Sequence, residues 1–432
     1  MGVLVHPLSA QRRELAGALL LALSLVLGCA DRSTDPVAPI RRDATPADLP
    51  GAGTVAGQLV IHVAPGRTVD EVHAEFGTSP VGSLPGQSTY LVAAPSSTSI
   101  AALAADLVGS MICDAAEPNY LLAAPETEQA SLAIYEGSFS HGDYVDQDAL
   151  ARIRANEAHA IATGRGVLVA IIDTGIDLDH PDLVDNLGTA PPGYDFIDED
   201  VEPDDLPNGI DDNGNGLVDE AVGHGSHVAG IVASAAPDAG VLPLRVLDSD
   251  GTGTAYNVVR AIYYAIDSGA GVINLSLGLD VNVLAMQTAI QAANDAGILV
   301  VASAGNRGIL DEGHFPACFP EVMAVTATDE LDQKAPFASF GGHISMSAPG
   351  VGIMSTYWNG GYALWSGTSM SAPLISGAGA LCMSLVPVSS DQAREFIEDG
   401  SEDLDDEGTP HDGLIGEGRV DLLGLVNEAM GD

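Results

Sequence analysis

Short apolar runs rich in β-branched residues alternate with amphipathic segments through the second half of this chain. Three of the runs are Val167–Ile172, Val272–Leu275 and Ile298–Val301. Two intervening segments, Tyr256–Asp267 and Leu284–Ala296, have the length and pattern of crossover helices. Such alternation predicts an α/β fold with a doubly wound, mainly parallel sheet flanked by helices. Active sites on such sheets gather at the carboxyl ends of the strands, so the polar residues that follow each run are the first candidates.

Three polar motifs occur in the order Asp, His, Ser. Asp173 follows the first run within Asp-Thr-Gly, and His224 opens His-Gly-Ser-His. Ser369 lies in Gly-Thr-Ser-Met-Ser-Ala-Pro, at the start of a segment rich in alanine, glycine and serine. A serine hydroxyl becomes an effective nucleophile when an imidazole takes its proton and a carboxylate orients that imidazole. The sequence therefore contains all three parts of a catalytic triad.

Asn306, in Ser-Ala-Gly-Asn after another apolar run, completes a set of four motifs. Together they resemble the subtilisin-like serine proteases, the subtilase family, over roughly residues 140 to 432. The resemblance implies a serine endopeptidase that hydrolyses peptide bonds through an acyl-enzyme. It implies Ser369 as nucleophile, His224 as general base and Asp173 as the group that orients the base. Asn306 would stabilise the oxyanion.

Each motif alone has a simpler explanation. An aspartate after a strand is often a turn residue, and Gly-Thr-Ser often caps a helix. His224 and His227 could belong to a metal site, although no further ligands with recognisable spacing accompany them. Ser226 stands where the family usually has threonine. The joint occurrence of the motifs favours catalysis, and two other classes stay open: a protease-derived surface binding module without turnover, and an esterase.

The resemblance also extends to substrate binding. Ser276, Leu277 and Gly278 match the segment that pairs with extended substrate as an added strand, and Gly251 and Gly253 match the loop facing it. Recognition through main-chain hydrogen bonds tolerates many side chains, so we expect protein or peptide substrates and broad specificity.

The primary pocket is less clear from the sequence. His314 aligns where the family lines the pocket floor with a smaller residue, and Asp311 and Glu312 lie close by in the sequence. A preference for basic residues before the scissile bond is one hypothesis, and solvated loop acids are the alternative.

The N-terminal residues 1–29 have the features of a secretory signal. Arg12 and Arg13 precede an apolar run, Leu15 to Leu27, which is too short for a convincing membrane span. The sequence before Cys29 resembles a lipoprotein cleavage box, so lipid anchoring to a bacterial envelope and ordinary secretion are both open.

A linker over 30–55 precedes a region, 56–125, with a βαββαβ-like pattern. This region resembles the inhibitory pro-domain of the family, and Glu117–Tyr120 resembles its last strand; an ordinary accessory domain is the alternative. A pro-domain has a physical purpose, because parallel strand pairing is non-local and slow to form. We expect a self-processed zymogen with its cut between about 124 and 140, in a segment 126–140 ahead of the peptidase domain, 141–432.

An acidic loop ahead of His224 predicts a structural calcium site, because oxygen ligands alternate along it and a glycine permits a sharp turn. Val222 replaces the glutamate that would close an EF-hand loop. A solvated acidic loop is the alternative. Asp182 matches a calcium ligand of the family, but the loop that completes that site is shortened here. The candidate ligands in the acidic loop are Asp211, Asn213, Asn215 and Asp219.

The charge balance is extreme, with 15 Lys plus Arg against 60 Asp plus Glu and a formal net charge of −45. A polyanion gains nothing from such a surface, which argues against nucleic acid as a partner. Self-repulsion predicts stabilisation by salt or divalent cations, and we expect a monomer. For Cys318 and Cys382 we expect two buried thiols in preference to a bridge.

Overall fold

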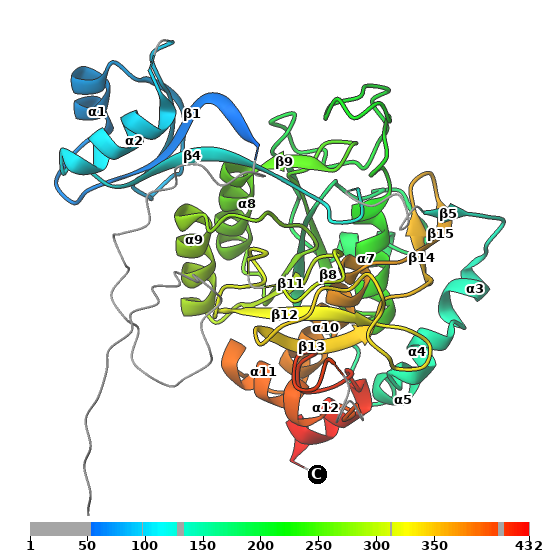
Figure 1. Cartoon of the computed structure of the whole chain (residues 1–432). Coiled ribbons are helices and arrows are strands. Elements are labelled where there is room, and N and C mark those ends of the chain that lie inside the picture. The colour runs from blue at the N-terminus through cyan, green and yellow to red at the C-terminus, as the bar shows by residue number, and fades with distance from the viewer. Residues whose placement is uncertain (1–52, 97, 128–133, 312, 405–409, 432) are drawn as a thin grey trace, which may run out of the picture.

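The computed structural model describes residues 53–432 except 97, 128–133, 312, 405–409 and 432 (Figure 1). The expected signal segment, its Cys29 anchor and most of the expected linker lie outside these residues. Three sheets are present in the described part of the chain, and the strands of the largest lie between residues 168 and 349.

The central sheet has seven strands in the order β13-β12-β11-β10-β6-β8-β7, and every neighbouring pair is parallel. Its strands are β6 (Leu168–Asp173), β7 (Tyr194–Asp195), β8 (Gly240–Arg245), β10 (Val272–Leu275), β11 (Leu299–Ser303), β12 (Val322–Thr328) and β13 (Ile344–Pro349). Their residues are almost all buried, as expected for a parallel sheet covered on both faces. The predicted α/β class is therefore confirmed.

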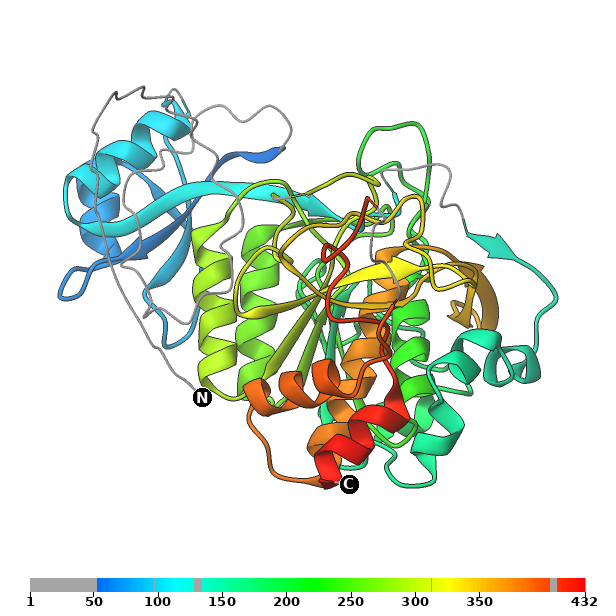
Figure 2. The same cartoon turned by 60° about the horizontal axis from the view of Figure 1, so that its bottom comes forward.

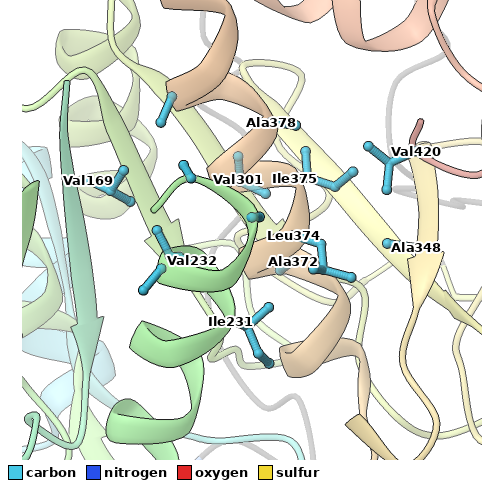
Figure 3. Packing of buried hydrophobic residues seen from close by; sticks show 14 of the residues in the cluster. Val169, Ile231, Val232, Val301, Ala348, Ala372, Leu374, Ile375, Ala378 and Val420 are labelled. Atoms are coloured by element: carbon cyan, nitrogen blue, oxygen red, sulfur yellow. The ribbon is translucent and has the colours of Figure 1, made fainter. Parts of the chain in front are cut away.

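Helices cover both faces of this sheet. Successive residues of β6 point to opposite sides: Val169 joins a core with α7 and α10, and Ala170 joins a core with α8 and α9. Figure 3 shows Val169 and Val301 facing Val232 of α7 and Ile375 of α10. The helices are α6 (Val184–Gly188), α7 (His224–Ala235), α8 (Ala255–Asp267), α9 (Leu284–Asp295), α10 (Thr368–Leu385), α11 (Ser390–Asp399) and α12 (Leu422–Met430). The predicted crossover helices correspond to α8 and α9.

The N-terminal unit is a small antiparallel sheet with two helices. Its elements are β1 (Thr54–Val63), α1 (Val69–Phe76), β2 (Ser79–Ser83), β3 (Thr89–Ala93), α2 (Ile100–Gly109) and β4 (Cys113–Ala123), with strand order β2-β3-β1-β4. This is the expected βαββαβ pattern. The far end of β4 continues onto β9 (Thr252–Thr254) of the α/β unit. Figure 2 shows β4, in cyan, running from the N-terminal unit across the α/β unit.

The chain after the N-terminal unit is attached to the far side of the α/β unit. β5 (Tyr135–Glu136) pairs with β15 (Gly361–Trp365), which pairs with β14 (Ile353–Tyr357). Three short helices lead back to β6: α3 (His141–Val145), α4 (Asp148–Arg152) and α5 (Ala155–His159).

Two further features concern α10. Cys382 on this helix is a free, buried thiol, and burial raises its pKa to about 12. Cys318 is disulfide-bonded, but not to Cys382, so the expectation of two thiols is wrong for Cys318. Among the described helices, none by itself is long and apolar enough to cross a membrane; α10 and α11 meet that test only as a pair bent by 112°.

Candidate active site

The fold brings the polar motifs to one edge of the sheet. Asp173 is the last residue of β6, and Asn306 follows β11. His224 is the first residue of α7, and Ser369 lies in the first turn of α10. The carboxyl ends of parallel strands and the N-termini of the next helices meet at the same edge, so these four residues converge although they are far apart in the sequence.

Asp173 and His224 form a buried pair. The His224 Nδ1–H donates to Asp173 Oδ1 at 2.6 Å, and the Thr174 N–H donates to the same oxygen at 2.8 Å. Both side chains are fully buried. Burial lowers the pKa of His224, but Asp173 and then Glu126 outweigh it and raise that pKa to about 10. The imidazole is therefore held as a cation that donates from both nitrogens.

Asn306 is oriented by the residue before the candidate nucleophile. Its Oδ1 accepts hydrogen bonds from the N–H and the hydroxyl of Thr368, both at 2.9 Å. This arrangement turns its Nδ2 toward Ser369. The Nδ2 donates to Glu126 Oε1 at 2.8 Å, and the Ser369 N–H donates to the same oxygen at 3.4 Å. Two donors thus converge on one oxygen, as an oxyanion hole requires.

Glu126 fills the centre of the site. Its Oε2 accepts hydrogen bonds from Ser369 Oγ at 2.7 Å and from His224 Nε2 at 3.1 Å. Burial would raise the pKa of this carboxyl, but the hydrogen bonds from His224, Ser369 and Asn306 lower it. A single carboxylate therefore contacts the candidate nucleophile, the candidate base and both oxyanion donors. The sequence analysis placed Glu126 in the segment 126–140 without a role; its position shortly after β4, the last strand of the N-terminal unit, was the available signal.

The expected substrate-binding residues hold the chain's own strand. The N–H and C=O of Gly278 exchange hydrogen bonds with Ala123, at 3.0 and 3.2 Å. The Ala124 N–H donates to Gly251 O at 3.0 Å, and Gly253 pairs with Leu122 in the β4–β9 ladder.

β4 ends at Ala123, and a turn follows. The Thr127 N–H donates to Ala124 O at 3.2 Å, so the chain turns back there instead of continuing through the site. Ser276 lies under the candidate nucleophile, since its hydroxyl donates to Ser369 O at 3.0 Å. Leu277, between Ser276 and Gly278, is buried in the core.

His227 has a structural role. Its Nε2 contacts the carbonyls of Ile353 and Ala363, both at 3.1 Å, and burial lowers its pKa to about 3. The ring is therefore neutral and does not face a ligand. No group of three or more His, Cys, Asp or Glu side chains able to hold a metal occurs among the residues that the structure describes.

Two residues near His224 were missed by the sequence analysis. Asp205 accepts hydrogen bonds from Gly223 N at 3.0 Å and from the Ser226 hydroxyl at 2.8 Å, and so caps α7; burial raises its pKa to about 6. The Trp365 ring stands edge-on to His224, with centroids 5.2 Å apart. Asp205 gave no signal, because it lies within a long acidic stretch.

The candidate calcium loop supplies carboxylate and amide oxygens, many of which already accept main-chain hydrogen bonds. The Asp211 carboxylate accepts from Asn215 N and Gly216 N, and Asp219 accepts from Asn208 N and Gly209 N.

One observation in this loop fits a cation. The side-chain amides of Asn213 and Asn215 both donate to Glu220 Oε1, at 3.1 and 2.7 Å. Glu220 Oε2 is buried without a hydrogen-bond partner. The doubtful second ligand, Asp182, is occupied differently: its Oδ2 contacts His141 at 2.9 Å and the Tyr362 hydroxyl.

Comparisons with known proteins agree with this geometry. The family model described as the subtilase family matches residues 164–413. Thermitase of Thermoactinomyces vulgaris is 39% identical over 268 residues, which are 60% of this chain and 89% of that protein. The thermophilic serine proteinase of Bacillus sp. (strain AK1) is 38% identical over 297 residues, 66% of this chain and 64% of the relative.

Subtilisin E of Bacillus subtilis (strain 168) is 34% identical over 263 residues, 58% of this chain and 64% of the relative. The alignments with two of these three relatives therefore span just under two thirds of their length. The crystal structure of a lanthipeptide protease superposes with a TM-score of 0.56 at 28% identity, over 65% of this chain and 93% of that one.

Proposed function

The chain belongs to the subtilase family of serine proteases, and on that premise we propose that it is a serine endopeptidase, made as a zymogen, that acts through Asp173, His224 and Ser369. One observation carries the proposal. The nucleophile, the base and the two oxyanion donors all contact a single carboxylate, that of Glu126. A peptide carbonyl placed there would meet every group that acyl transfer needs.

The reaction follows from these positions. Ser369 Oγ attacks the carbonyl carbon of the substrate and gives its proton to His224 Nε2. The carbonyl oxygen becomes an oxyanion where Glu126 Oε1 now lies, held by Asn306 Nδ2 and the Ser369 N–H. His224 then protonates the leaving amine as the C–N bond breaks. Water repeats the sequence on the acyl ester and regenerates Ser369, while Asp173 keeps the imidazole oriented.

The N-terminal unit would act as an intramolecular inhibitor and folding aid. Glu126 blocks the catalytic groups, and β4 occupies the strand position that a substrate would take. The Glu117 carboxylate accepts the N–H groups of Leu284 and Ala285, at 3.0 and 2.8 Å, at the start of α9. Asn119 Oδ1 accepts the Tyr256 N–H, at 3.2 Å, at the start of α8. These contacts cap two helices whose first N–H groups have no partner within the helix.

The cut that would free the enzyme lies between about 124 and 140. β5 at Tyr135–Glu136 is already paired with β15 of the catalytic unit, which favours a cut ahead of it. We further propose that residues 1–29 direct export and that Cys29, if acylated, anchors the enzyme to the envelope.

Calcium belongs to the proposal as a structural ion. Asp211, Asn213, Asn215 and Asp219 would hold it, and the unpartnered Glu220 Oε2 supports a cation at this loop. Two carboxylates and two amides provide fewer than the six to eight oxygens that calcium takes, so main-chain carbonyls and water would complete the shell. The ion would tie the acidic loop to the segment that precedes His224.

The alternative is a binding module without turnover. The same observation favours it, because a buried carboxylate on Ser369 closes the site for as long as the N-terminal unit stays attached. The two functions differ in whether the unit is released.

Intact mass distinguishes them. We would follow the purified wild type and Ser369→Ala over time, with and without calcium and salt. The wild type is expected to lose its N-terminal unit while Ser369→Ala stays full length, which would establish self-processing and its junction together. If both chains remain intact under all conditions, the endopeptidase proposal fails and the binding module replaces it.

A further inference from the structure

We propose that His314 makes the pocket for the residue before the scissile bond selective for an acidic side chain, glutamate above all. This inference rests on the proposed peptidase function and names its substrate class. It narrows the expectation of broad specificity. The pocket for this substrate residue would select an acidic side chain, while main-chain pairing tolerates many side chains at the other substrate positions.

His314 lies against the two segments that would hold the substrate. Leu279 and Phe315 exchange main-chain hydrogen bonds at 2.9 and 2.8 Å, which seats His314 beside Gly278. A side-chain carbon added at Gly278 would come within 2.2 Å of His314 Nε2, and one at Gly305 within 3.2 Å of its Cδ2. The imidazole therefore packs directly on the backbone that pairs with substrate and on the residue before Asn306.

One edge of this imidazole has no partner. His314 is only 7% exposed, and its Nε2 is buried without a hydrogen bond. Its Nδ1 lies 3.6 Å from Asp280 Oδ1. A buried polar atom left unpaired is costly, which suggests that the Nε2 is completed by a ligand. With Asp280 behind the ring, the protonated imidazole can donate from Nε2 to a substrate carboxylate.

The surrounding charges favour an acid over a base. Arg307 binds the carboxylates of both Asp280 and Asp311, the second at 2.6 Å. The Asp311 Oδ1 also accepts the Gly313 N–H at 3.0 Å. Asp311 is therefore occupied by an arginine of the protein and is not available to a basic substrate side chain. Glu312, the other acid behind the hypothesis of a basic preference, lies outside the described residues.

The chain's own junction fits the same preference. An enzyme that processes itself must accept one of its own peptide bonds, and the cut is proposed between about 124 and 140. That stretch contains Glu126, Glu128 and Glu136 and has neither lysine nor arginine. Glu126 and Glu128 precede β5, where the cut is favoured, so a pocket for acidic side chains would find two sites there and a pocket for basic ones would find none.

The test uses the processed enzyme and four peptides that differ only in the residue before the scissile bond: Glu, Gln, Leu or Lys. Glutamate and glutamine have nearly the same shape, so the ratio of their kcat/KM values isolates the charge. We expect the wild type to prefer Glu over Gln by about tenfold or more, as a site built for one polar group does.

Variants separate specificity from folding. His314→Gly should lose most of the Glu/Gln ratio, whereas His141→Gln, an exposed histidine on α3, should leave it unchanged. Should His314→Gly fail to fold, the wild-type Glu/Gln ratio still decides. A wild-type ratio near one, or a preference for Lys, overturns this inference alone. A released enzyme that cleaves none of the four peptides overturns the proposed function and this inference with it.

Discussion

The two sheets of this molecule bury their faces in different ways. The parallel sheet of the catalytic unit is covered on both sides by its own helices. The antiparallel sheet of the N-terminal unit covers one face with α1 and α2, where Leu59 and Ile61 lie, while Val60 and Leu91 on the other face join the core around α8 and α9. The N-terminal unit therefore buries the second face of its sheet against the catalytic unit.

This difference indicates how the two units depend on each other during folding and after it. The longest-range pairing of the N-terminal unit joins β1 to β4, as in Leu59 with Pro118, whereas the central sheet joins β6 to β10, as in Val169 with Val272. Contacts over shorter separations form faster, so we expect the small unit to fold first. A unit that folds early and presents an apolar face and two helix caps can template α8 and α9. Under the proposed zymogen function, its remaining hold on the enzyme would then be the inhibitory one.

Without its nucleophile the chain could not release the N-terminal unit, which would then remain as a permanent domain. Ser369→Ala is expected to lower kcat by about 10⁶-fold, because the serine forms the covalent intermediate. The N-terminal unit should then stay covalently attached. Peptide hydrolysis measured on chains freed of the N-terminal unit by an added protease checks the rate. Residual activity within tenfold of the wild type would show that Ser369 is not the nucleophile.

Asn306, the proposed oxyanion donor, would act in the reaction and also donates to Glu126 in the full-length chain. Asn306→Leu should lower kcat by about 10²–10³, because one of two donors to the developing charge is lost. Ser303→Ala, at the end of the strand that leads to Asn306, is the matched control, since its hydroxyl is buried without a partner and should contribute little. Steady-state kinetics of the two variants compare them directly. Equal losses would mean that the loop responds to any change and that the Asn306 amide has no special role.

Raising the pH should loosen the inhibited state. The pKa of His224 is raised to about 10 from an ordinary 6.5, so the stabilisation from its protonated form is complete below about 6.5 and is lost as the pH rises through about 10. Glu126 contributes part of that shift, and its share disappears on release. The rate at which the cleaved N-terminal unit dissociates should therefore increase with pH over this interval.

Glu126→Gln is the control for this pH effect. The amide keeps the shape of the side chain but not its charge, so dissociation should be faster at neutral pH and should depend less on pH. If the variant retains the full pH dependence of the wild type, then the pair of Glu126 and His224 does not control release.

Much of this architecture is visible in the sequence, for a physical reason. Asp173 and Asn306 could be found because each follows a continuous buried run, and parallel strands end at a common edge. The role of Glu126 was not predicted, since its place in the site depends on the turn from Ala124 to Thr127 and on hydrogen bonds from three distant segments. The contact of His314 with Asp280 likewise depends on pairing between two loops.

The helix caps test whether the N-terminal unit helps the catalytic unit to fold. Glu117→Ala should weaken docking of the N-terminal unit by about 1–2 kcal/mol, the usual cost of a lost cap, and slow refolding of the chain. Asp114→Ala, an exposed acid on the same strand, is the control. Refolding of both variants in the Ser369→Ala background, followed by fluorescence, avoids proteolysis. If Glu117→Ala refolds as fast as Asp114→Ala, the cap on α9 is not part of the folding aid.

The smallest expected effect is on the melting temperature. It distinguishes the screening of charge repulsion by salt from the binding of a specific calcium ion. At a net charge of −45, molar NaCl should raise the melting temperature through screening alone, whether or not calcium is bound. A calcium ion at the acidic loop adds a second increment, a few degrees, which a chelator removes at any salt concentration. Asp211→Asn should abolish the chelator effect and leave the salt effect, whereas Asp238→Asn on the surface should change neither. A chelator effect that disappears in molar salt would assign the whole stabilisation to screening and remove calcium from the loop.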